Sequence, residues 1–134
     1  MRTRLAIFLA LVVGIAASVA IAAPDKVTSP FVDEATSLGT VSGSATLDPT
    51  GPGGDLMLHA KLSGLDPGLT YELVVLTEAA SCGFGEPLET IQFQANAAGI
   101  ANVNRKVTED ISLIGSVAIR FPGVDPTLVA CADF

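Results

Sequence analysis

Two stretches in the middle of the chain alternate between apolar and polar positions. The apolar positions of the first stretch are Leu56, Leu58, Ala60 and Leu62, and those of the second are Leu69, Tyr71, Leu73 and Val75. The turn sequence Asp66-Pro67-Gly68 lies between them. Pro67 presets φ for the first central turn position, and Gly68 accepts the positive φ that a type II turn needs next. Alternation with period two on both sides of a turn predicts a β-hairpin with one buried face.

The rest of the chain after residue 39 continues this pattern in short pieces. Further strands are expected over residues 41–47, 90–95, 101–107, 117–121 and 128–134, separated by turn-forming residues. Asn96-Ala97-Ala98-Gly99 is expected to be a hairpin turn, because Asn and Gly adopt left-handed geometry at low cost. Residues 108–114 predict one short helical turn with Thr108 as its cap. About seven mostly antiparallel strands without a long amphipathic helix favour an all-β sandwich or a small barrel.

The first 22 residues have the order of features that is typical of a signal peptide. Residues 1–4 contain two arginines, residues 5–23 carry no charge, and Ala20-Ile21-Ala22 is a small-residue cleavage site. We therefore expect a signal peptide helix over residues 1–22 and a secreted, periplasmic or cell-envelope protein. The alternative is an uncleaved membrane anchor, since the apolar run is near the lower limit for crossing a bilayer. Residues 23–38 show no period and predict a linker or a loosely docked arm before a domain over residues 39–134.

The charge balance narrows the range of partners. Removal of residues 1–22 takes away Arg2 and Arg4, which leaves five basic residues against 14 acidic ones and a net charge of about −9. Nucleic acid and anionic membrane surfaces repel such a surface, so neither is an expected partner once the signal is cleaved. Repulsion between like-charged copies favours a monomer or a weak homodimer.

The two cysteines, Cys82 and Cys131, are an even number in a chain with an export signal, which predicts a disulfide. The alternative is two buried free thiols. A bridge that closes a loop of about 50 residues stabilises a fold by roughly 4 kcal/mol in the chain-entropy model.

Residues that could carry chemistry are few. His59 is the only histidine, and the alternation places it on the solvent face, whereas zinc and copper sites need three or four nitrogen or sulfur ligands. Asp48, Asp55 and Asp66 would offer oxygens to calcium, but their spacing fits no known calcium loop and they read as turn-forming residues. The acidic pairs read as solvated surface; they are Glu72 with Glu78, Glu86 with Glu89, and Glu109 with Asp110. We therefore predict no catalytic residue, no metal ligand and no cofactor.

Two short motifs nevertheless carry a family resemblance. Gly64-Leu65-Asp66-Pro67-Gly68 enters a strand that is followed by a loop cysteine, and the chain ends with Leu128-Val129-Ala130-Cys131-Ala132-Asp133. Over roughly residues 39–134 this resembles the copper/zinc superoxide dismutase superfamily. The resemblance implies an antiparallel Greek-key β-sandwich of about 7–8 strands. It also implies a disulfide between the loop cysteine, Cys82, and the cysteine of the last strand, Cys131.

The departures from the family pattern indicate that the family's activity is absent. Two copper-ligating histidines of the family fall on Leu73 and Val75, the guiding arginine falls on Leu128, and the histidine-rich zinc loop has no counterpart. We therefore expect a secreted, non-catalytic domain with a structural or binding role, whose ligand and partner the sequence does not identify. The alternatives are a membrane-anchored envelope protein and a divergent enzyme of the dismutase family.

Overall fold

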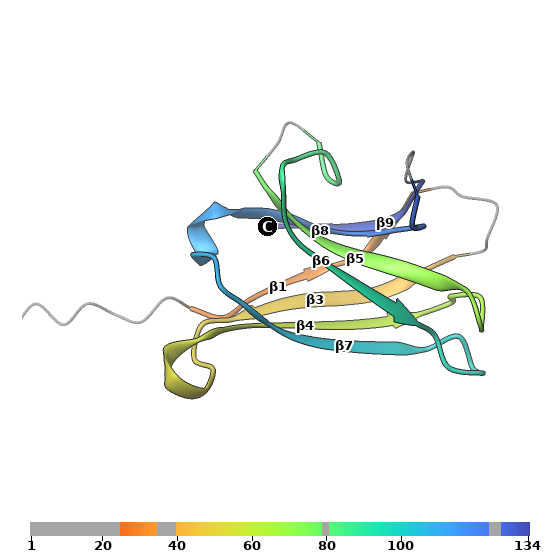
Figure 1. Ribbon diagram of the computed structural model, residues 1–134, viewed down its shortest axis with the longest axis horizontal. Coiled ribbons are helices and arrows are strands. Elements are labelled where there is room, and N and C mark those ends of the chain that lie inside the picture. The colour runs from red at the N-terminus through yellow and green to blue at the C-terminus, as the bar shows by residue number, and fades with distance from the viewer. Residues whose placement is uncertain (1–24, 35–39, 79–80, 124–126) are drawn as a thin grey trace, which may run out of the picture.

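The computed structural model describes residues 25–34, 40–78, 81–123 and 127–134. The signal peptide expected over residues 1–22 lies outside these ranges. The described chain forms nine strands in two antiparallel sheets, together with two short 3₁₀ turns, and Figure 1 shows the sheets stacked on each other. No helix within these ranges has the length and apolar character that crossing a membrane requires.

The two sheets divide the strands unequally. Sheet A has the order β1 (Val27–Pro30), β3 (Ser42–Asp48), β4 (Leu56–Ser63) and β7 (Ala101–Val107). Sheet B has the order β2 (Val32–Asp33), β9 (Leu128–Asp133), β8 (Ile114–Arg120), β5 (Thr70–Thr77) and β6 (Pro87–Gln94). The 3₁₀ turns are η1 (Pro52–Gly54) and η2 (Ile111–Leu113). The prediction of an all-β, two-layer antiparallel fold is confirmed.

The central hairpin predicted from the alternation is wrong in its pairing. Both strands form, but β4 pairs with β3 and β7 in sheet A, while β5 pairs with β6 and β8 in sheet B. The turn at residues 64–69 therefore carries the chain from one sheet to the other. β4 and β5 each have an apolar face. That face is buried equally well whether the two strands pair within one sheet or lie in two stacked sheets. Gly64 makes this exit possible, because its φ is +81° and an added Cβ would overlap the Thr40 carbonyl oxygen.

The second predicted hairpin, with its turn at residues 96–99, is also wrong in its pairing, because the strands before and after the turn lie in different sheets. The tight turn itself is present: the Gly99 N–H donates to the Asn96 carbonyl over 2.9 Å, and the Asn96 N–H donates to the Ile100 carbonyl over 2.9 Å. However, β6 before the turn belongs to sheet B and β7 after it belongs to sheet A. Turn chemistry thus predicted the reversal of the chain but not the change of sheet.

The segment expected to be a linker or a loosely docked arm contributes two strands instead. Strand β1 pairs with β3, strand β2 pairs with β9, and Phe31 between them is buried. The Phe31 N–H donates to the Gly43 carbonyl of sheet A, and the Glu34 N–H donates to the Val129 carbonyl of sheet B. This segment therefore passes from one sheet to the other along one side of the sandwich.

The expected helical turn over residues 108–114 is shorter and has a different cap. It covers η2 only, and the capping residue is Asp110 rather than Thr108. One carboxylate oxygen of Asp110 accepts from both the N–H and the hydroxyl of Ser112. These two hydrogen bonds lower the pKa of Asp110 from its ordinary value, so this carboxylate stays charged.

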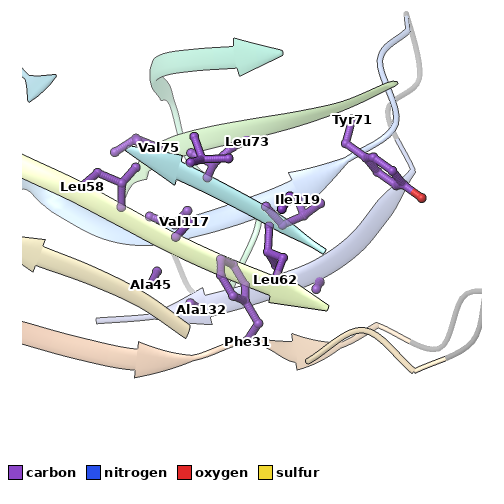
Figure 2. Close-up of a cluster of buried hydrophobic side chains, with 14 of the residues drawn as sticks. Phe31, Ala45, Leu58, Leu62, Tyr71, Leu73, Val75, Val117, Ile119 and Ala132 are labelled. Carbon is purple, nitrogen blue, oxygen red and sulfur yellow. The ribbon is translucent and has the colours of Figure 1, made fainter. Parts of the chain in front are cut away.

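The core lies between the two sheets. Side chains from both sheets fill it, and Figure 2 shows Leu58 of β4 among Leu73, Val75, Val117 and Ile119 of sheet B. Tyr71 lies apart from this group in Figure 2 and stacks on Phe93 and Phe121, with ring centroids 5.7 and 5.3 Å away.

Candidate functional site

The first candidate site is the stretch of β5 onto which the family resemblance places two copper ligands. Leu73 and Val75 have no exposed surface and lie in the layer between the sheets, as Figure 2 shows. Their expected burial with Leu56, Leu58 and Ile119 is confirmed. The other face of the same strand is apolar as well, because Val74 is 2% exposed and Leu76 is fully buried. A shift of the alignment by one residue therefore restores no metal ligand, and these residues do not fit a copper ion.

The outer face of this strand is covered by the loop that carries the disulfide. The predicted bridge between Cys82 and Cys131 is present, with its two Cα atoms 5.9 Å apart. Both cysteines pack with apolar residues of sheet B: Val74, Leu76 and Ala118 are buried, and Leu128 is partly buried. The loop therefore closes a second, smaller apolar cluster over the outside of sheet B.

Polar contacts hold this loop against the sheet. The Gly83 N–H donates to the buried hydroxyl of Ser116 over 3.4 Å, and the Arg120 guanidinium donates to the Gly83 carbonyl. Arg120 is the Cα partner of Leu128, the position at which the resemblance places the guiding arginine. Sequence reasoning missed Arg120, because its position beside the loop depends on the pairing of β8 with β9. Its guanidinium serves as a loop anchor in this structure.

His59 lies on the outer face of sheet A. Its Nδ1 is 2.7 Å from the Asn104 Oδ1 on the neighbouring strand. The three aspartates considered for calcium are not brought together: Asp48 bonds Thr50 and Lys26, and Asp55 pairs with Lys106. Asp66 lies beyond the opposite end of β4. Across the described ranges, no three His, Cys, Asp or Glu residues are grouped so that they could hold a metal ion.

Two adjacent hollows at one end of the sandwich form the second candidate site, which we call the end groove. The larger, of about 610 Å³, lies between residues 49–56 and residues 106–111. The smaller, of about 270 Å³, is lined from both sheets by Val27, Leu47, Ile114, Phe134 and others. Ile111 of η2 lines both hollows, which are therefore adjacent. In Figure 1 the two connecting loops and the C-terminus lie at this same end.

Carboxylates outnumber cations in the end groove. Asp55, Glu109 and Asp110 line the larger hollow, and Glu78 lines the smaller one. Among the residues that the structure describes, Lys106 is the only basic one that lines either hollow, and its ammonium is 2.7 Å from an Asp55 carboxylate oxygen. Of the acidic pairs that the sequence presented, only Glu109 with Asp110 thus borders a hollow together. The groove itself could not be found from the sequence, because its walls are two loops about 50 residues apart.

Comparison of the sequence with protein-family models and with curated proteins gives no match.

Proposed function

We propose that this protein is an exported, metal-free β-sandwich of the superoxide dismutase type that acts by binding rather than by catalysis. The observation that carries the proposal is the apolar run of β5. Residues 73–76 are buried on both faces of the strand, and they include Leu73 and Val75, on which the resemblance places two copper-ligating histidines. A side chain without a nitrogen, oxygen or sulfur donor cannot ligate copper.

The relation to the dismutase superfamily is proposed on three features together. The Gly-Leu-x-x-Gly turn enters β5, the disulfide joins a loop to the last strand, and the strand connections agree with a Greek key. The last point rests on the order of strands: β4 lies beside β7 in sheet A, while the intervening β5 and β6 pair in sheet B. Connections that pass between two sheets in this way are usual in Greek-key sandwiches.

Export is proposed on two independent features. The N-terminal order of basic, apolar and small residues is that of a signal peptide, and disulfides persist in oxidising compartments. The proposed location is therefore outside the cytoplasm, as a secreted, periplasmic or cell-envelope protein. Its net charge of about −9 after cleavage favours a monomer or a weak homodimer and a partner that is neither nucleic acid nor an anionic membrane surface. The intact mass of the exported protein distinguishes a cleaved signal from a retained anchor.

The decisive experiment is metal loading of the disulfide-bonded protein. The purified protein is incubated with excess Cu²⁺ and Zn²⁺, desalted, and analysed for metal content and for removal of superoxide. We expect metal well below one ion per chain and no activity above that of buffer. A His59→Gln variant is the control, because it removes the only imidazole of the chain. Stoichiometric copper, or superoxide removal that this variant loses, would overturn the proposal.

A further inference from the structure

The end groove combines a size and a lining that suit a ligand with an apolar part. Leu56, Val107 and Ile111 contribute to the larger hollow, and Val27, Ile114 and Phe134 contribute to the smaller one. Ligand sites typically have volumes of about 300–1,000 Å³; the larger hollow, of about 610 Å³, lies within this range, and the smaller one, of about 270 Å³, lies just below it. The smaller hollow shares Ile111 with the larger one, so a ligand that fills both hollows contacts this side chain.

The charge of the groove selects a cationic ligand. Four carboxylates line the two hollows against one ammonium, and that ammonium is already paired with Asp55. Asp110 is held in its charged form by Ser112. Glu109 has no ion-pair partner among the described residues. Because the whole mature chain is also strongly acidic, its long-range field attracts cations and repels anions.

We propose that the end groove binds a basic segment of a partner polypeptide in an extended conformation. An apolar side chain of the segment enters the smaller hollow next to Ile111, and its Lys or Arg side chains face the carboxylates of Glu109 and Asp110. An extended peptide can contact both hollows, because they share Ile111 and successive side chains of an extended chain point in opposite directions. This inference rests on the binding role proposed above and names the chemistry of the partner.

The test uses the disulfide-bonded protein and three synthetic peptides of equal length. One alternates Lys with Leu, the second alternates Lys with Ser, and the third alternates Glu with Leu. Binding is measured by calorimetry, and the site is mapped by amide chemical shifts. We expect binding of the Lys–Leu peptide only, weakening with salt because charge contacts are screened, with the largest shifts at Val107, Ile111 and Ile114.

Two charge reversals locate the contact. Glu109→Lys removes a groove carboxylate, whereas Glu86→Lys makes the same change of net charge in the exposed disulfide loop. We expect Glu109→Lys to weaken the Lys–Leu peptide about tenfold, and Glu86→Lys to weaken it by less than about twofold. Equal weakening by both variants would mean that only net charge attracts the peptide, and would overturn the proposal. Absence of binding would overturn it as well.

The remaining outcomes separate this inference from the proposed function. Equal binding of the Lys–Ser peptide would overturn the apolar contact next to Ile111, and binding of the Glu–Leu peptide would overturn the charge selection. None of these peptide results bears on metal binding at β5, so the proposal of a metal-free sandwich would remain valid. Conversely, stoichiometric copper in the loading experiment would contradict the proposed function, whatever the peptides show.

Discussion

Truncation of Leu73 to alanine measures how much this buried side chain of β5 contributes to the free energy of unfolding. Leu73 has no exposed surface, and its Cα partners on the two neighbouring strands are Ile91 and Ile119. The change deletes three buried carbons, which is roughly 2.4 kcal/mol of transfer free energy at about 0.8 kcal/mol per carbon. Two stiff β-branched neighbours limit how far the site can collapse, so a cavity penalty adds to this. We expect a total loss of about 3–5 kcal/mol in the free energy of unfolding.

Urea unfolding of the oxidised protein provides the assay. The chain has one tyrosine and no tryptophan, so the fluorescence of Tyr71 reports on the core directly. With a denaturant slope of about 2 kcal/mol per M, a loss of about 3 kcal/mol lowers the midpoint by roughly 1.5 M. Leu113→Ala is the matched control, because Leu113 is 50% exposed and the same truncation there costs less than about 0.5 kcal/mol.

The comparison has a clear refuting result. If Leu73→Ala and Leu113→Ala have similar midpoints, Leu73 is not a core residue and the β5 position is open to solvent or to a ligand. If Leu73→Ala does not fold, Leu73→Val keeps most of the volume, and a measurable loss for this milder variant supports the same conclusion.

Two further predictions test other parts of the fold. Burial raises the pKa of Tyr71 above its ordinary value, so its ultraviolet titration should have a higher midpoint in the folded than in the urea-unfolded protein. The resulting stability is present below the ordinary pKa and is lost as pH rises through the raised value; identical midpoints would contradict this. Gly64→Ala should destabilise more than Gly68→Ala, although both glycines have positive φ near 80°, because only a Cβ at Gly64 meets neighbouring backbone. Equal urea midpoints of the two variants would show that the close approach at Gly64 does not constrain the turn.

The strands were predictable from the sequence, but their pairing was not. Alternation reports which face of a strand is buried, and it located the central strands β4 and β5 within a residue or so. It does not report whether two consecutive strands pair within one sheet or lie in opposite sheets that face each other across the core. Both predicted hairpins proved to be changes of sheet for this reason.

The strands in residues 27–33 were missed because they are too short to show a period. Strand β1 has four residues and β2 has two, and each lies at the edge of a sheet with one neighbour. Edge strands bury little, so their sequence keeps polar residues such as those around Thr28. The available signal was the apolar pair Phe31 and Val32, of which the structure buries Phe31 and leaves Val32 60% exposed.

The strongest sequence signal about the candidate site was the run Leu73-Val74-Val75-Leu76, which interrupts the alternation. A strand of an antiparallel sheet with one solvated face alternates, whereas a strand covered on both faces reads as a continuous apolar run. The inner face of this run meets sheet A, and the outer face needs a cover, which the loop of Cys82 supplies. The disulfide and the apolar residues at the family's ligand positions, Leu73 and Val75, are thus linked through one strand. The bridge holds the loop over Val74 and Leu76, on the outer face of β5, while Leu73 and Val75 fill the core on its inner face. Apolar side chains occupy both faces of β5 at Leu73–Leu76, so the basic ligand proposed above has to be bound elsewhere on the surface, and the acidic loops around Glu109 offer such a place.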